Sequence, residues 1–170
     1  GEAASLNDDR VGRALDRLFD ADRAAIMTEI VLRAIAGFEI DLDRLHNDST
    51  TITVTGQYRE ADGREERGKP TVEVTYGHNK DHRQDLKQIL FALTVTGDGA
   101  VPVHYRAWDG NTSDSKTHID SWETLRKLAG TPGFLYVADS KLCSRPVMAH
   151  IHAHRGRFVT VLPRSRKEDR

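Results

Sequence analysis

Two acidic residues in strand-like surroundings are the strongest candidates for chemistry in this sequence. Asp48 lies inside the run Leu45–Thr55, where Ile, Val and Thr alternate with polar residues, and Asp139 directly follows the apolar run Phe134–Ala138. Ligand sites in α/β sheets gather at the carboxyl ends of strands, so the two carboxylates converge if these strands are neighbours. Two oxygen ligands on rigid strands suit Mg²⁺, and a pair of such ions activates water and stabilises a leaving 3′ oxygen in phosphodiester cleavage.

Both acids also have a purely structural interpretation. Asp48 stands in an Asn-Asp-Ser run, which is typical of a turn or a cap, and an Asp after a strand often caps the next helix. Because a long stretch of chain separates Asp48 from Asp139, spacing alone leaves both interpretations open.

The hydrophobic periodicity predicts the elements that must position these acids. After Asn7, apolar residues at helical spacing from Val11 to Phe19 predict a capped amphipathic helix, and Ala24–Phe38 predicts a second that stops near Gly37. Both helices are expected to face a core. The remaining pattern predicts strands over Leu45–Thr55, Thr71–Tyr76, Ile89–Thr96 and Ala100–Trp108, a helix from Thr112 or Ser113 to just before Gly130, a strand over Phe134–Ala138, a short helix over Pro146–His154, and a strand over Arg157–Leu162.

This order of elements predicts an α/β fold with a mixed sheet. The segment Gly56–Pro70 carries acids, bases and three glycines, and we expect a polar connection there. The continuous apolar run Phe134–Ala138 is typical of a central strand buried on both faces, often parallel to its neighbours.

Composition restricts the class of protein. The chain has 170 residues, 38% of them hydrophobic and 30% charged, which suffices for one sizeable core and excludes a disordered tail. No window approaches the length of a membrane span, so we expect no membrane partner. The single Cys143 favours a reducing compartment, and we predict a cytoplasmic location. Because Gly1 stands at the start, the chain is expected to be a fragment.

The charge is unevenly distributed along the chain. A formal net charge of −1 excludes a uniformly basic nucleic-acid binder. From Ser140 to Arg170, however, Lys and Arg far outnumber the two acids Glu168 and Asp169. This end is predicted to face phosphate, with a solvated surface as the alternative.

Four ordered blocks carry a resemblance to a known family: Leu45–Thr51 (LHNDSTT), Gly77–Gln88 (GHNKDHRQDLKQ), Gly110–Asp114 (GNTSD) and Val137–Ser140 (VADS). Together they resemble the DDE transposases of bacterial insertion sequences, and more narrowly the insertion-sequence-four type, whose catalytic core is ribonuclease-H-like. The similarity runs from about Leu6 to Leu162.

The resemblance implies that Asp48 and Asp139 are the first two members of a DDE triad that binds two Mg²⁺ ions, with Mn²⁺ as a substitute. It implies hydrolysis at the ends of the element, followed by strand transfer into target DNA by a 3′-hydroxyl. DNA would be the partner, the complete protein would form a homodimer, and its location would be the bacterial nucleoid.

The third acid of that family is a Glu on a later helix, near a Tyr, Arg and Lys signature. Glu168 lies too close to the last predicted strand to be that residue. We therefore expect a helical segment over 1–43, an incomplete ribonuclease-H-like core over 44–163 that lacks the final catalytic helix, and a basic tail over 164–170. Two other functions stay open: an inactive remnant that binds only DNA or a partner, and a Mg²⁺-dependent nuclease of the same fold.

Basic residues near these blocks are the candidates for DNA contact. Lys141 follows Asp139 by two positions and would lie near the scissile phosphate. Ion pairs with Asp81 and Asp85 are the alternative for the basic residues of the second block. The predicted DNA-binding residues are Lys80, Arg83, Lys141 and Arg145.

An alternating histidine run stands apart from these blocks. On a helix, His150 and His154 share a face as i and i+4 metal ligands do, whereas His152 does not. No acid or cysteine pattern lies nearby in the sequence, so the run indicates a structural zinc site only weakly. Cys143 has no partner base that the sequence identifies, and we do not expect it to be a nucleophile.

Overall fold

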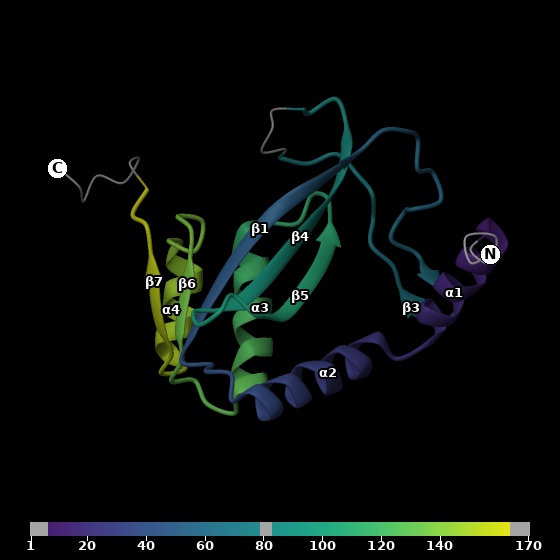
Figure 1. Ribbon diagram of the computed structural model, residues 1–170. Helices are drawn as coiled ribbons and strands as arrows, with labels where there is room; N and C mark the ends of the chain where they lie inside the picture. Colours follow the sequence, from purple (N-terminus) through teal and green to yellow (C-terminus); the bar gives the residue numbers. More distant parts are fainter. Residues whose placement is uncertain (1–6, 79–82, 164–170) are drawn as a thin grey trace. The chain divides into compact units, whose positions relative to one another are not determined.

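The computed structural model describes residues 7–78 and 83–163, without the side chain of Asp114 (Figure 1). The chain divides into two compact units, unit 1 (Gly1–Ile40) and unit 2 (Asp41–Arg170), and each is described by itself. Lys80 and the segment 164–170 lie outside the described residues. No helix in the described part of the chain is both long and apolar enough to cross a membrane.

Unit 1 consists of two capped helices in its described residues. The Asn7 side chain accepts a hydrogen bond from the backbone N–H of Arg10 at 2.9 Å, and Asp22 does the same for Ala25 at 3.0 Å. The second helix continues one residue past Gly37 to Phe38, and its C-cap is Glu39, which is left-handed at φ 51°. The bounds are α1 Asp8–Asp20 and α2 Arg23–Phe38.

The expectation that both helices face a core is wrong for most of their apolar side chains. Among the described residues of this unit Val31 alone is buried, while Leu15 is 60% and Ile30 55% exposed. Two helices are too small a set to enclose an apolar core, so the amphipathic pattern correctly predicts the helices but not their burial.

Unit 2 is built on a five-stranded sheet within its described residues. The strand order is β5-β4-β1-β6-β7, in which β4 is antiparallel to β1 and β5, while β6 runs parallel to both β1 and β7 (Figure 1). The bounds are β1 Arg44–Val54, β4 Lys87–Thr96, β5 Pro102–Asp109, α3 Asp114–Ala129, β6 Leu135–Ala138, α4 Arg145–Ala153 and β7 Arg157–Thr160.

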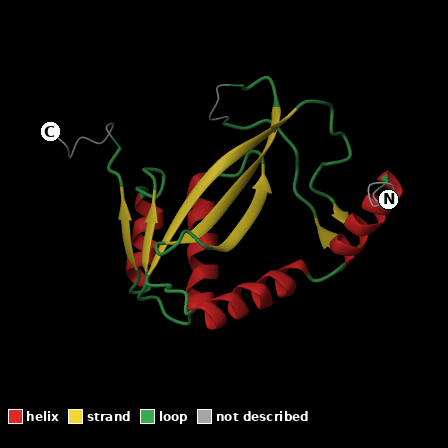
Figure 2. Ribbon diagram, in the orientation of Figure 1, coloured by secondary structure: helices red, strands yellow, loops and turns green. Residues whose placement is uncertain are grey.

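The sheet is mixed as predicted, and its order is that of a ribonuclease-H-like core. Three antiparallel strands come first, and two parallel strands follow through the crossover helices α3 and α4. Parallel neighbours need such crossovers, because a short hairpin joins only antiparallel strands. Figure 2 shows α3 and α4 side by side next to the strands they connect.

The core lies between the sheet and the helices α3 and α4. Alternate residues of β1, beginning with Leu45, are buried, and Tyr136 of β6 is fully buried beside them in register. Trp122 and Leu125 of α3 and Val147 and Ile151 of α4 are also fully buried. The other face of the sheet is more exposed, and there Phe91 stacks on Tyr105 with ring centroids 6.1 Å apart.

The predicted strand over Thr71–Tyr76 is wrong. Successive residues of this segment bond to different partners: Glu73 N–H to the carboxylate of Asp109, Val74 N–H to the carbonyl of Ala61, and Thr75 N–H to the carbonyl of Gln88. A ladder needs one partner strand, so only isolated bridges form. The expected polar connection instead contains a two-residue hairpin, β2 Glu65–Glu66 with β3 Lys69–Pro70.

Two glycines of the sequence blocks allow this segment to approach the sheet. A Cβ on Gly110 would lie 2.1 Å from the carbonyl oxygen of Gln88, and a Cβ on Gly77 would lie 2.0 Å from that of Gly110. The buried Gln88 side chain donates a hydrogen bond from Nε2 to the Gly110 carbonyl at 2.8 Å. Glycine is required at both positions because any side chain would collide with backbone.

We expect Gly110→Ala to lower the free energy of unfolding by roughly 2–4 kcal/mol, because a backbone contact of this kind cannot relax by rotating a side chain. Urea denaturation followed by circular dichroism measures the change. Gly133→Ala is the control, since its Cβ would meet only the movable Thr131 hydroxyl at 3.3 Å. Equal stability of the two variants would contradict the close approach at Gly110.

His104 of β5 is a partly buried ionisable group. Its Nδ1 is one of the buried side-chain atoms that have no hydrogen-bond partner among the described residues. Burial, and next the positive charge of Arg106, lower the pKa of His104 from 6.5 to about 4. The folded state therefore holds this imidazole neutral, whereas the unfolded chain protonates it below about pH 6.5.

Because the unfolded state binds the extra proton between about pH 6.5 and pH 4, acid favours unfolding in that window. We expect the unfolding free energy to fall by an amount on the order of 1 kcal/mol between pH 7 and pH 5 through this residue. Urea denaturation at the two pH values measures it. His104→Gln should remove this part of the pH dependence, and an unchanged slope would rule out His104 as its source.

Candidate functional site

The pairing of β1 with β6 places the two candidate acids at adjacent positions. The parallel register runs from Arg44 opposite Leu135 to Asn47 opposite Ala138. One step further along both strands are Asp48 and Asp139. Neighbouring strands lie about 4.8 Å apart, so the two carboxylates start from adjacent backbone positions.

Both acids are exposed to solvent. The alternation along β1 buries Asn47 and Ser49 and directs Asp48 to the opposite face of the sheet, and Asp139 is exposed just beyond the end of β6. Asn47 fixes this alternation, because its Nδ2 donates to the buried Thr94 hydroxyl at 2.8 Å. The structure thus places both acids at adjacent, solvent-exposed positions of neighbouring strands.

Backbone amides orient both carboxylates. The Ser49 N–H donates to Oδ1 of Asp48 at 2.8 Å, and the Lys141 N–H donates to Oδ1 of Asp139 at 3.0 Å. The Thr160 hydroxyl of β7 donates to the Asp139 carbonyl, which fixes the backbone at the end of β6. A carboxylate has about four acceptor sites when ionised, so a single bond of this kind orients it without saturating it.

Two exposed, oriented carboxylates fit a hard divalent cation. Mg²⁺ prefers oxygen ligands, retains several waters and is commonly held by one or two carboxylates together with substrate phosphates. Within the described residues, no group of three His, Cys, Asp or Glu side chains at metal-binding distance includes Asp48 or Asp139. The described site therefore offers two protein ligands.

Beneath Asp139 lies a buried aromatic pair. The Tyr136 hydroxyl lies 3.2 Å from Nδ1 of His118, and both side chains are buried. Burial and, next, the negative charge of Asp139 raise the pKa of Tyr136. Tyr136 is therefore a neutral support of the strand and not an acid or base at neutral pH.

A hollow of about 450 Å³ is lined by residues that are close to the two acids in the sequence, although neither acid is among them. Its lining joins β1 at Thr51, three residues after Asp48, with Lys141, two residues after Asp139. Three of the four sequence blocks contribute to it. The lining residues are Thr51, His78, Gln88, Leu90, Gly110, Asn111, Thr112, Ser113, Ser115 and Lys141.

Sequence reasoning missed part of this lining. Thr51, Leu90 and Ser115 come from three separate elements, and no local pattern indicates that they meet. Gln88 closes the second sequence block, which was the available signal. Ser113 is the N-cap of α3, as predicted, but its side chain makes no capping hydrogen bond.

The predicted DNA-binding residues occupy different surroundings. Lys141 lines the hollow, and Arg145 is exposed as the first residue of α4. Arg83 forms two hydrogen bonds with Asp85, and this pairing raises the pKa of Arg83 and lowers that of Asp85. Lys80 lies outside the described residues. Lys141 is thus tied to Asp139 through its backbone N–H, whereas Arg83 is paired with Asp85.

Comparison with known proteins gives similarity to solved structures alone. No family model matches the chain, and no curated protein matches it. The catalytic domain of Mos1 mariner transposase is 11% identical with a TM-score of 0.42, over 94% of this chain and 64% of that one. A Mos1 mariner paired end complex with Mn is 14% identical with a TM-score of 0.41, over 94% of this chain and 44% of that one.

A pre-cleavage Mos1 transpososome is 12% identical with a TM-score of 0.43, over 82% of this chain and 42% of that one. The chain thus spans less than half the length of the proteins in the two complexes. TM-scores below 0.5 support no further argument, and the ribonuclease-H-like assignment rests on the strand order.

Proposed function

We propose that this chain is part of a DDE-type DNA transposase, which cleaves the ends of its element and transfers them into target DNA. The observation that carries the proposal is the parallel register of β1 and β6, in which Asp48, within β1, and Asp139, just after β6, occupy adjacent positions. The narrower insertion-sequence-four assignment rests on the four sequence blocks alone.

Asp48 and Asp139 would hold the divalent metal, Mg²⁺ with Mn²⁺ as a substitute. The bound metal would activate water for hydrolysis, activate the 3′-hydroxyl for strand transfer and stabilise the leaving oxygen. The chain's own contribution is to keep the two carboxylates exposed and oriented by the backbone amides of Ser49 and Lys141. A third acid from outside these residues would complete the triad.

Lys141 would bind a DNA phosphate next to the metal ligands. Its backbone N–H orients the Asp139 carboxylate, while the residue also lines the hollow. A single residue therefore links the Asp139 carboxylate to the hollow. Lys80, Arg83 and Arg145 are proposed as outer phosphate contacts, and the homodimer and nucleoid location belong to the same proposal.

A second function has an observation in its favour. The described residues supply two carboxylates and no third ligand at this place, which suits a domain that binds DNA or a partner without cutting it. Metal-dependent cleavage separates this alternative from the transposase. Joining of a 3′ end to a second DNA separates the transposase from a nuclease of the same fold.

We expect Asp48→Asn and Asp139→Asn each to abolish Mn²⁺-dependent nicking of supercoiled DNA by the full-length polypeptide that carries this sequence. Each replacement removes a charged metal ligand, whereas DNA affinity should be retained or slightly increased because a negative charge is lost. A gel assay of plasmid relaxation and fluorescence anisotropy with a short duplex measure the two effects.

Asp98→Asn is the matched control. Asp98 is exposed in the turn after β4, and its substitution removes the same charge. It should leave nicking unchanged. Cleavage that survives in both the Asp48 and Asp139 variants would overturn the metal site. An equal loss of cleavage in the Asp98 variant would show that the loss comes from the change in net charge and not from the removal of a metal ligand.

We expect Lys141→Ala to weaken duplex binding and to reduce the slope of log affinity against log salt by about 1, as the loss of one phosphate contact does. Lys141→Arg should preserve most of the affinity, because it keeps the charge. Lys127→Ala, at an exposed position of α3, is the control. An unchanged salt slope in Lys141→Ala would exclude a phosphate contact there.

A further inference from the structure

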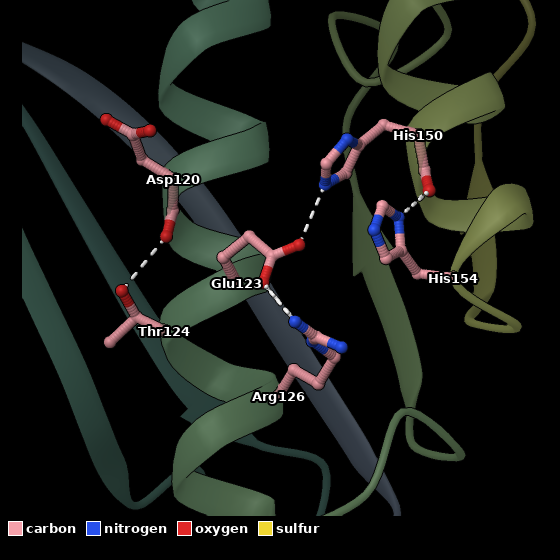
Figure 3. A network of polar contacts seen from close by, with 6 residues as sticks. All are labelled: Asp120, Glu123, Thr124, Arg126, His150 and His154. Carbon is pink, nitrogen blue, oxygen red and sulfur yellow. Dashed lines mark hydrogen bonds and ion pairs between the residues drawn. The ribbon is translucent and has the colours of Figure 1, made fainter.

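A cluster of three metal-ligating side chains lies where α3 packs against α4, separate from the candidate acids. Glu123 comes from α3, His150 comes from α4, and His154 is the C-cap residue that follows α4 (Figure 3). One ligand atom from each residue lies within 4.8 Å of the others. No acid lies near the histidines in the sequence, but α3, which packs against α4, supplies one.

The hydrogen bonds of His154 prepare it as a ligand. Its Nδ1 lies 2.8 Å from the backbone carbonyl oxygen of His150. A carbonyl oxygen only accepts, so Nδ1 carries the proton and Nε2 of the neutral ring has a lone pair. A metal-ligating histidine commonly donates its other ring N–H to a carbonyl or carboxylate in this way.

Glu123 is oriented from its other side. Arg126 holds Oε2 at 2.7 Å, which leaves Oε1 directed at Nε2 of His150 at 2.9 Å (Figure 3). Burial raises the pKa of Glu123, but its hydrogen bonds with His150 and Arg126 outweigh burial and lower it, so the carboxylate is ionised at neutral pH.

The Trp122 ring contacts both imidazole rings. The ring centroids of Trp122 and His150 are 5.8 Å apart at 87°, and those of Trp122 and His154 are 6.0 Å apart. Trp122 is fully buried, so this support belongs to the core. The two histidine rings themselves lie 4.4 Å apart, on the same side of α4.

We propose that Glu123, His150 and His154 bind a zinc ion that links α3 to α4. Two imidazoles and one carboxylate form a donor set that zinc takes with a fourth position for water, and His154 is exposed enough to admit that water. Ligand atoms about 3.3 Å apart surround a tetrahedral zinc at 2.0–2.1 Å, so small side-chain rotations close the present spacing. Imidazole ligands disfavour Mg²⁺, which separates this site from Asp48 and Asp139.

Zinc titration of the full 170-residue chain without a histidine tag, in competition with a chromophoric chelator, tests the site. We expect one zinc per chain and a rise in melting temperature with zinc. His154→Gln and Glu123→Gln should each weaken binding at least tenfold. His152→Gln, the third histidine of the run and exposed, should bind as the unaltered chain does.

Circular dichroism shows whether each variant folds, and the exposed position of His154 protects that variant from a loss of core packing. Asp48→Asn should keep zinc stoichiometry at one, so failure of the proposed function and failure of this site give different results. The absence of saturable binding, unchanged affinity in His154→Gln and Glu123→Gln, or an equal loss in His152→Gln would each overturn the proposal.

Discussion

The candidate site depends on one constraint, the register between β1 and β6. Side chains alternate along a strand, so a slip by one residue would turn Asp48 into the core and Asn47 out to solvent. Burial of Leu45 opposite Tyr136 on one side, and the Asn47–Thr94 hydrogen bond on the other, oppose that slip. The buried neighbours of the two acids therefore fix the positions of the acids, although both acids are themselves exposed.

The helices that close the core also determine what else the fold can bind. A parallel β6 requires the crossover α3, and β7 requires α4, so these helices must pack against each other over the same sheet. Trp122 is buried between these two helices. Its ring packs against the rings of His150 and His154, which lie close to Glu123 of α3. The proposed zinc site thus lies between α3 and α4, whereas the proposed magnesium site lies on β1 and at the end of β6. The two sites share no ligand.

Local periodicity predicted most of the elements, because helices and ladders with a single partner leave a regular pattern in the sequence. It failed at Thr71–Tyr76, whose alternation is real but whose backbone bonds are divided among Ala61, Gln88 and Asp109. Asp48 and Asp139 were identifiable as candidates, because each stands in or directly after a strand-like run, although their adjacency depends on the pairing of β1 with β6. Glu123 was not, since only the packing of α3 on α4 brings it to the histidines and no local signal encodes that contact.

Two exposed carboxylates alone make a modest site for Mg²⁺, because water competes well for a strongly hydrated ion. Phosphate oxygens of DNA would supply further ligands at the same place, so metal and DNA would each raise the affinity for the other by the same factor. On the face of Asp48, Leu93 is 38% exposed and has no hydrogen-bond donor, and Tyr105, which is 44% exposed, offers only a neutral hydroxyl. In the proposed function, the positive charge that would meet a phosphate is that of Lys141, which follows Asp139 by two positions and whose backbone N–H donates to its carboxylate.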